Sequence, residues 1–507
     1  MKTKRTQNLL VAVLASALAA ISSQAQTAQS SPYGFERSYP AVGMVDRVHD
    51  ASALRRAIEA YKFFYPTVSS EALWQELLAA GAKINDRSLI MLSTPRQVFP
   101  TTADSDTPYA MGGFDLSTTG PLVVEMPAGP LVGFLNDAHM RWVHDLGRPG
   151  QDKGEGGRHL ILPPGFAGEV PQGYFVGRAE AKNVRLFIRS SPVRGDVAQA
   201  IRSFDAVRIY PLSAARRRPV HQFFDTSRQT DRHMYFPLLA WKDSFEYWQQ
   251  LKKVIDEETV ISEFRPMYGM LASVGIVKGQ PFAPDARMRE ILSVAARTAV
   301  EEMRTLNYAN RIPDRIYWSD RKWELLIVRS TTREYDGFGA PSFIDFDARG
   351  YFSFQAWATS PAMGMQTEGP SSMYSMYLAA YRDSTGALLD GGKTYKLTIP
   401  QPVPADHFWS TTLYDVDSRS QIATVQNKAV PSSRYSFQLD PDRSLDLYFG
   451  PTAPVGKEAQ WVKTIPGKGW FNYFRIYGPQ AAAFDGRWKL PDIELVYVQV
   501  ANARSDR

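Results

Sequence analysis

The feature that most constrains the fold is a series of short apolar runs separated by Pro and Gly. Each run has the length and composition of a β-strand, and the spacing favours packed antiparallel sheets over alternating βαβ units. In the first half the predicted strands are 89–92, 122–126, 131–136, 159–162, 173–176, 184–189 and 207–210. In the second half they are 352–357, 373–382, 394–399, 407–415, 436–439, 445–449 and 469–477.

Helical periodicity appears at the start of the chain and between the two β-rich halves. The pattern predicts helices over 52–65 and 70–80, the second ended by Gly81, and over 245–268 and 285–307. The predicted fold is mainly β with helical segments: two dissimilar β-sandwich domains, 50–240 and 341–507, joined by a helical connector, 241–340. The first domain includes the N-terminal helices.

The first residues have the pattern of a secretory signal peptide. Lys2, Lys4 and Arg5 precede an apolar run over 9–21, and small residues follow at a cleavage site after Ala25 or Ala28. We therefore predict a signal peptide over 1–25, an extended segment over 26–49, and an exported protein that is periplasmic or secreted. The run is shorter than the roughly 20 apolar residues of a membrane span, although an uncleaved anchor is the alternative.

Charge and cysteine content exclude several classes of function. The formal charge of +6 falls to +3 without residues 1–25, and Arg216–Arg218 is the one compact basic run, so nucleic acid is not an expected partner. With no cysteine among 507 residues, disulfides, thiolate nucleophiles and cysteine metal sites are excluded. Stability must come from large cores.

Several motifs resemble a family of two-domain proteins. Segments 99–109 and 114–116 with Pro121 are similar to domain of unknown function 1254. Segments 393–400, 408–415 and 471–479 are similar to domain of unknown function 1214, and 268–287 to the connector of two-domain members. The resemblance covers roughly residues 50 to 490 and implies two jelly-roll-like sandwiches joined by helices. It implies little about function, because a shared fold does not supply chemistry.

The segment 136–159 has the composition of a functional site. It gathers three of the seven histidines, four carboxylates, three arginines and Trp142 around a glycine-rich loop. If 131–143 is one strand, Asp137, His139 and Arg141 share a face. An Asp beside a His can orient the imidazole, which suits a general base or a metal ligand.

The remaining polar residues of this segment extend the candidate site. Asp145 and Asp152 are expected to join Asp137 and Arg141 in catalysis, while Trp142 contacts the ligand. His144 and His159 are candidate ligands of a divalent metal, although their spacing matches no established metal motif. The alternative is an internally paired corner in which the histidines serve packing.

The family pattern, as the resemblance implies it, matches at Asp137, Arg141, Trp142, Asp145 and Asp152. His139 stands where an aromatic residue is common. The resemblance therefore favours the carboxylates and Arg141 over His139 as the functional groups.

A second acidic segment precedes Pro108. Asp104 and Asp106 lie two residues apart, so on a strand they share a face and can divide acid and base roles. Tyr109 can supply a phenolic donor beside them. The alternative is a turn in which Asp104 accepts hydrogen bonds from backbone N–H groups.

In the second half, Tyr473, Arg475 and Tyr477 occupy alternate positions of one predicted strand. They can line a ligand groove or close a sandwich core, and a buried Arg475 requires a partner. Phosphate, dinucleotide, serine-hydrolase and zinc-protease motifs are absent from the sequence.

Two classes of function remain. One is an exported enzyme, hydrolase-like in mechanism with or without the help of a divalent metal, that acts on a small organic or carbohydrate-like molecule in the first sandwich. The other is a non-catalytic protein that binds a ligand or assembles into a homo-oligomer through its jelly-roll faces, which the 24 tyrosines and 11 tryptophans could line.

Overall fold

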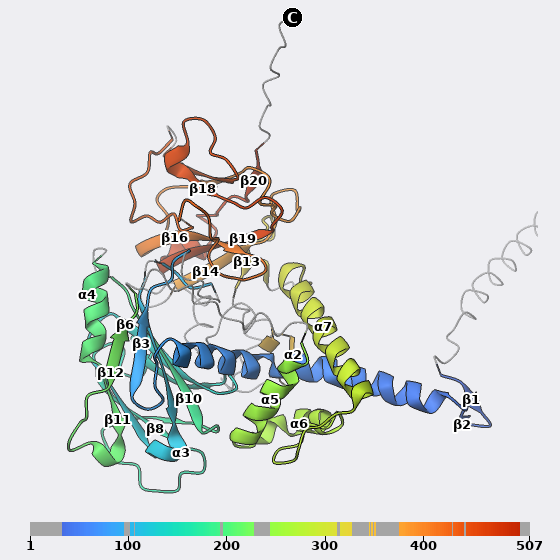
Figure 1. Cartoon of the computed structure of the whole chain (residues 1–507). Coiled ribbons are helices and arrows are strands. Elements are labelled where there is room, and N and C mark those ends of the chain that lie inside the picture. Colours follow the sequence, from blue (N-terminus) through green and yellow to red (C-terminus); the bar gives the residue numbers. More distant parts are fainter. Residues whose placement is uncertain are drawn as a thin grey trace, which may run out of the picture.

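The computed structural model describes most of both predicted sandwiches (Figure 1). The described residues are 33–95, 102–105, 107–192, 196–227, 244–311, 315–326, 344, 346–347, 349–350, 375–427, 429–440 and 443–496. The predicted signal peptide, the predicted strand over 352–357 and Asp106 lie outside them.

Two packed sheets form the first sandwich. The six-stranded sheet has the order β12-β3-β4-β10-β6-β7 and the four-stranded sheet the order β11-β5-β8-β9. Their facing apolar residues, among them Leu135, Leu186, Val124 and Ile161, are fully buried and form one core. The strands are β3 (Arg87–Met91), β4 (Tyr109–Asp115), β5 (Leu122–Met126), β6 (Leu131–Asp137), β7 (Trp142–Gly147), β8 (Gly157–Leu162), β9 (Phe175–Arg178), β10 (Asn183–Ser190), β11 (Arg208–Pro211) and β12 (Gln222–Asp225).

The second sandwich is built from two four-stranded sheets, with orders β13-β14-β19-β16 and β18-β17-β15-β20. Leu378, Phe474 and Leu413 of the first sheet meet Leu397 and Leu447 of the second in a shared core. The predicted fold class is therefore confirmed. The strands are β13 (Glu324–Leu325), β14 (Ser375–Ala380), β15 (Tyr395–Ile399), β16 (Ala405–Asp415), β17 (Leu445–Gly450), β18 (Trp461–Lys463), β19 (Trp470–Pro479) and β20 (Glu494–Leu495).

One long helix, α2 (Met44–Ala79), replaces the two helices predicted over 52–65 and 70–80, and that division was wrong. Pro66 lies inside α2, where it removes one helical hydrogen bond. Nearby carbonyls gain side-chain donors instead: the hydroxyl of Tyr247 donates to the Tyr61 carbonyl at 2.9 Å, and Nε of Arg349 donates to the Phe63 carbonyl at 3.0 Å. Burial on every side keeps the helix continuous.

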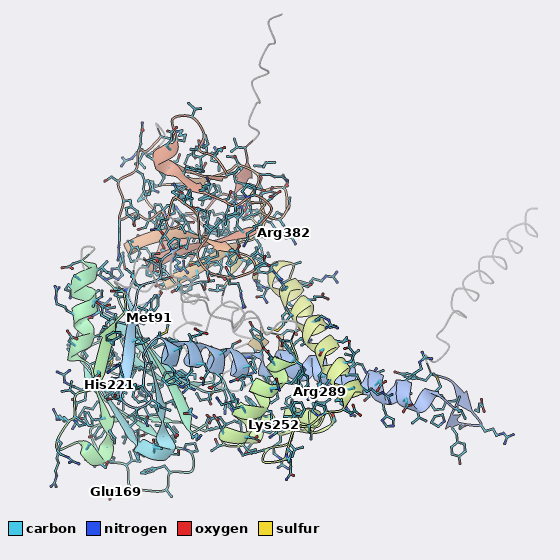
Figure 2. All side chains as sticks on the ribbon, viewed as in Figure 1. Met91, Glu169, His221, Lys252, Arg289 and Arg382 are labelled. Atoms are coloured by element: carbon cyan, nitrogen blue, oxygen red, sulfur yellow. The ribbon has the colours of Figure 1, made fainter. Side chains whose placement is uncertain are left out.

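Helix α2 connects the first sandwich to a helical cluster (Figure 1). Around Phe63 and Phe64 it packs against α5, α6 and α7. Toward its C-terminal end, Trp74 and Leu77 cover Leu89 and Met91 of the six-stranded sheet. Figure 2 labels Met91 in this sheet, near that end of the helix. The other described helices are α3 (Leu116–Thr119), α4 (Val197–Arg202), α5 (Glu246–Glu257), α6 (Arg265–Ala272) and α7 (Ala286–Tyr308).

Before α2, a two-stranded hairpin of β1 (Phe35–Glu36) and β2 (Tyr39–Pro40) lies at the tip of the projecting helix (Figure 1). Within the part of the chain that the structure describes, no helix combines the length and the apolar character needed to cross a bilayer.

The prediction of one continuous strand over 131–143 was wrong. Strand β6 ends at Asp137, the four residues 138–141 form the connection, and β7 begins at Trp142 and pairs back with β6. Met140 in the turn has φ of 61°, which no strand residue adopts. Asp137 and Arg141 therefore stand at the two ends of a hairpin turn. The predicted strand over 436–439 was also wrong, because those residues carry no strand.

Strand β4, which contains the adjacent glycines Gly112 and Gly113, was not predicted. Both glycines permit close approach: a Cβ atom at Gly113 would lie 2.6 Å from the Trp74 ring, which packs directly on the strand.

We predict that Gly113→Ala lowers the free energy of unfolding by about 1–3 kcal/mol, because the buried indole must move. Gly269→Ala is the control. Its Cβ meets nothing within 4 Å in α6, so this change should raise stability by about 0.5–1 kcal/mol. Urea unfolding of both variants measures the difference. Equal effects at the two positions would contradict the packing of Trp74 on β4.

Candidate functional site

The β6–β7 turn is held by its own first residue. Oδ1 of Asp137 accepts hydrogen bonds from the backbone N–H groups of His139 at 2.8 Å and Arg141 at 3.0 Å. Burial raises the pKa of Asp137, against the lowering effect of Arg141 and these two hydrogen bonds. The contacts of Asp137 are those of a turn-forming carboxylate.

Arg141 joins the turn to neighbouring segments. Its guanidinium pairs with Glu180 at 2.6 Å and with Glu263 at 3.0 Å. Both carboxylates are half exposed, so the two ion pairs are screened by solvent. With its charge committed in this way, Arg141 is better suited to positioning the turn than to binding a ligand.

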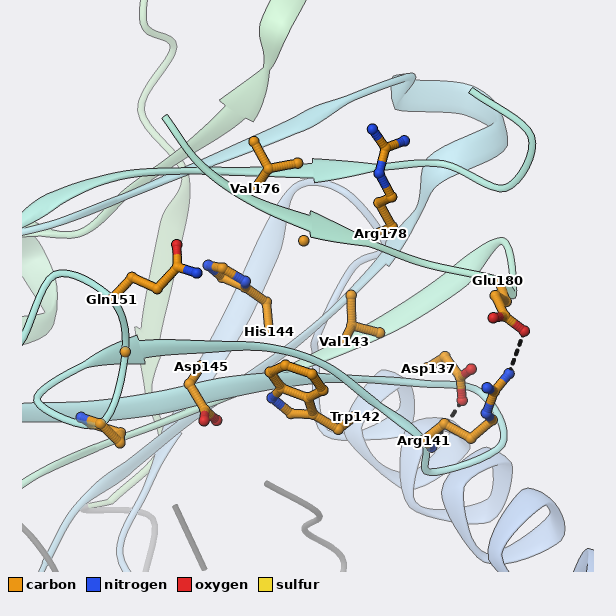
Figure 3. Close-up of a pocket in the computed structure, with 13 residues that line it drawn as sticks. Asp137, Arg141, Trp142, Val143, His144, Asp145, Gln151, Val176, Arg178 and Glu180 are labelled. Carbon is orange, nitrogen blue, oxygen red and sulfur yellow. Dashed lines mark hydrogen bonds and ion pairs between the residues drawn. The ribbon is translucent and has the colours of Figure 1, made fainter. Parts of the chain in front are cut away.

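A cavity of about 510 Å³ opens beside this turn, between the edge strands β7 and β9 of the two sheets (Figure 3). Five of the residues singled out from the sequence line it: Asp137, Arg141, Trp142, His144 and Asp145. The others are Val143, Pro149, Gly150, Gln151, Val176, Gly177, Arg178 and Glu180. The sequence segment thus does form a concave site, with a mixture of polar and aromatic walls.

Behind the cavity wall, His144, His159 and Asp152 form a buried chain. Nε2 of His144 lies 2.9 Å from Nδ1 of His159, and Nε2 of His159 lies 3.4 Å from Oδ1 of Asp152. The three residues are 4%, 0% and 3% exposed. They come from β7, from β8 and from the loop between these strands, so only the folded sandwich brings them together.

The buried series His144–His159–Asp152 has a preferred arrangement of protons. The Asp152 oxygens have no hydrogen-bond partner among the described residues, and a buried carboxylate is costly without a nearby proton. A proton on the facing Nε2 of His159 is therefore favoured. In a neutral His159 ring, Nδ1 then accepts from Nε2–H of His144, which leaves the lone pair of His144 on Nδ1.

Nδ1 of His144 has no hydrogen-bond partner among the described residues. His144 belongs to the wall of the cavity, and Figure 3 shows it near Gln151 and Val143. Burial lowers the pKa of His144 to about 3, reinforced by His159 and opposed by Asp152. His144 is therefore neutral near pH 7 and offers a proton-accepting nitrogen to the cavity.

A metal at His144 and His159 has limited support from the geometry. The two rings use one nitrogen each for their mutual hydrogen bond. Across the described ranges, no three His, Cys, Asp or Glu side chains are grouped as metal ligands. The arrangement suits proton transfer, and sequence spacing could not reveal it because the contact depends on two strands and a loop.

The second group of predicted residues lies between the two sandwiches. Tyr473, Arg475 and Tyr477 share one face of β19, as predicted, and that face lies outside the core between the two sheets of the second sandwich. Tyr473 packs in a smaller buried cluster with Tyr414 and Phe471. The Arg475 guanidinium donates to Thr412 Oγ1 at 3.0 Å, to the Tyr414 hydroxyl at 2.8 Å and to the carbonyl of Thr102. The partner that a buried arginine requires comes in part from the other domain.

Asp104 belongs to the same interface. The Tyr477 hydroxyl donates to Oδ2 of Asp104, and the Tyr109 hydroxyl accepts from the Asp104 backbone N–H at 3.3 Å. Burial, with Asp104 the next cause, raises the pKa of Tyr109 and of Tyr477. These two phenols stay neutral at physiological pH. The five described residues of this group therefore meet, although the sequence assigned them to different sites.

Arg189 of β10 was missed. It donates to the Tyr377 hydroxyl at 3.0 Å and to Ser375 Oγ at 3.1 Å, both on β14 of the second sandwich. Its place on an apolar strand, in Phe-Ile-Arg-Ser, was the available signal, because a charged residue there needs a partner.

The fold and these two sites define a two-domain protein of paired β-sandwiches with a cavity at one sheet edge and a polar interface between domains. Residues 86–211 match the family model described as protein of unknown function (DUF1254), and residues 374–481 match protein of unknown function (DUF1214). The chain thus joins a DUF1254 region to a DUF1214 region, as the resemblance implied. No curated protein matches the chain.

One solved structure supports the fold. The VPA0106 protein from Vibrio parahaemolyticus is similar with a TM-score of 0.53 and 18% identity, covering 88% of this chain and 100% of that one. An uncharacterized protein from Burkholderia cenocepacia has a TM-score of 0.36 and 10% identity, covering 90% of this chain and 97% of its own. The first likeness concerns the fold alone, and the second is too weak to support an argument.

We predict that the imidazole of His144 stays neutral as the pH falls from 7 to 5. Its folded pKa of about 3 lies below the ordinary value near 6.5, so the unfolded chain binds more protons in that interval. Above about pH 6.5 the ring is neutral in both states, so this difference does not reduce the free energy of unfolding. As the pH falls below 6.5, only the unfolded chain takes up the proton, and the free energy of unfolding declines. Histidine ring NMR checks the protonation state, and a His144 titration near pH 6.5 would contradict the buried chain.

Replacing Arg475 with Met should lower the free energy of unfolding by about 3–5 kcal/mol, because the buried acceptors from both domains lose their donor. The matched control is Arg487→Ala, an exposed arginine paired with Asp485, for which a change within about 0.5 kcal/mol is expected. Thermal and urea unfolding provide the comparison. If R475M is as stable as the control, the interface does not depend on this guanidinium.

Proposed function

We propose that the protein is an exported enzyme that performs acid–base chemistry on a small, carbohydrate-like molecule in the cavity beside His144. The observation that carries the proposal is the His144–His159–Asp152 chain, which ends at the wall of that cavity. Export is supported by the basic start, apolar run and small residues of the first 25 positions.

The buried series His144–His159–Asp152 allows His144 to act as a general base. Nδ1 of His144 takes a proton from a hydroxyl group or a water molecule in the cavity, and the proton on its Nε2 moves to Nδ1 of His159. The resulting positive charge on His159 is stabilised by the carboxylate of Asp152, 3.4 Å away. Return of the proton along the same path lets His144 act as the acid. Protein groups alone complete this cycle.

The cavity walls support the class of substrate. A volume of about 510 Å³ lies within the roughly 300–1,000 Å³ of small-molecule sites. Trp142 offers an aromatic face, and Gln151 and Asp145 offer amide and carboxylate groups that suit hydroxyl groups on a sugar-like ring. Asp137 and Arg141 position the turn that forms one end of the cavity.

The alternative is a protein that binds the same kind of molecule without converting it, or that assembles through its sheets. Such a protein would bind the molecule and leave it chemically unchanged. The buried chain favours the enzyme, because a ligand-binding cavity alone does not require two hydrogen-bonded histidines backed by a buried carboxylate.

We predict that His144→Ala and Asp152→Asn each lower kcat at least about 100-fold, because each removes general acid–base catalysis. A panel of aryl glycosides, sugar lactones and small sugar esters supplies the activity to be measured. His49→Ala, an exposed histidine outside this cavity, is the control and should keep full activity.

Two results would count against the enzyme. If folded D152N retains the wild-type kcat, the buried chain has no catalytic role. If the wild-type protein binds a member of the panel by calorimetry and converts none, the non-catalytic alternative is favoured.

A further inference from the structure

A second cavity, of about 290 Å³, lies on the helical side of the β6–β7 turn, away from His144. The end of α5, helix α6 and the turn residue His139 enclose it. Most of its wall is apolar, including Ile255, Ile276 and Val277. The volume is close to the lower limit, about 300 Å³, of small-molecule sites.

His139 brings an unsatisfied polar atom to this cavity. The residue is completely buried, and Nδ1 lies 2.9 Å from the hydroxyl of Thr67 in α2. Nε2, on the other side of the ring, has no hydrogen-bond partner among the described residues. Buried polar atoms are almost always satisfied, so an orphaned ring nitrogen beside a cavity points to a ligand that supplies the missing partner.

Other polar groups of the cavity are already committed. Glu258 accepts from the side-chain amide of Asn183 at 2.6 Å and from the backbone N–H of Lys182 at 2.9 Å. Lys278 donates to three carbonyls near the end of α5, at 2.6 to 3.0 Å. Neither is available to hold a small molecule without losing these contacts.

Arg265, unlike Glu258 and Lys278, is available to bind a ligand. It is an exposed residue of the cavity wall, and its guanidinium has no ion pair or hydrogen bond within the described part of the chain. A solvent-accessible arginine with a free planar face of donors is suited to a carboxylate.

His139 can act as a neutral hydrogen-bond donor. Burial lowers the pKa of His139 to about 3, with Arg349 and Arg141 adding to the effect, so the ring is neutral near pH 7. If the Thr67 hydroxyl donates to Nδ1, the ring carries its hydrogen on Nε2 and can donate it. Nε2 then lacks an acceptor, and the positive charge of Arg265 in the same wall favours a carboxylate in that role.

We propose that this cavity binds a small amphipathic carboxylate. The apolar part of the ligand packs against Ile255, Ile276 and Val277, and the carboxylate accepts hydrogen bonds from Nε2–H of His139 and from Arg265. The site is separate from the cavity beside His144, so it does not depend on the proposed enzyme activity.

Calorimetric titration of the purified protein with hexanoate tests the proposal, and hexan-1-ol is the matched uncharged probe. Hexanoate should bind, and the alcohol should bind at least about tenfold more weakly, because it lacks the charge-assisted hydrogen bonds. Addition of hexanoate should also shift the ring nitrogen resonances of His139.

Arg265→Ala should weaken hexanoate at least about tenfold while leaving the alcohol unchanged. Arg297→Ala, an exposed arginine on α7, is the matched control and should have no effect. Ala272→Leu, which adds volume to the cavity wall, should weaken both probes, with folding checked by circular dichroism.

Failure of the wild-type protein to bind hexanoate at millimolar concentration would overturn the proposal. So would hexanoate binding that is the same in R265A, A272L and the wild type, or that leaves the His139 resonances unmoved. Either of the latter results would place the carboxylate elsewhere on the protein.

Discussion

The contact between the β6–β7 turn and α2 is the interaction on which both cavities depend. His139, at the turn, lies 2.9 Å from Thr67 of α2, and Arg349 donates to the His139 carbonyl at 2.8 Å while also contacting Phe63 of the helix. These contacts fix the turn on a rigid, buried helix. The cavity beside His144 lies on one side of the turn and the cavity beside His139 on the other.

A second constraint acts between the domains. Burying Arg475 and Asp104 separately would leave charges without partners, and burying them in one interface satisfies both. The second sandwich presents a polar face of alternating Tyr, Arg, Ser and Thr side chains, and the first sandwich supplies Asp104, Arg189 and the carbonyl of Thr102. The polar character of this face gives the two sandwiches a specific mutual orientation, since each hydrogen bond has a direction.

Much of the fold could be predicted because strand signals are local. The runs over 122–126, 131–136 and 445–449 are strands within one residue of their predicted ends. Predictions failed where tertiary contacts overrode the local signal: Gly112 and Gly113 admit Ser88 and Trp74 against a strand, and the buried surroundings of Pro66 keep α2 intact. The hairpin at Asp137 was missed because its turn contains no glycine or proline, and Met140 takes the positive φ instead.

For the site, the sequence by itself determined which residues are costly to bury and therefore need a partner, among them Asp137, His144, Asp152 and Arg475. It also determined that β19 presents Tyr473, Arg475 and Tyr477 on one face, since strand alternation is a property of the backbone. Only the tertiary structure decided the partners. His144 meets His159 and Asp152, and Arg475 meets Thr102, because these contacts join segments that are distant along the chain, and local patterns hold no information about such distances.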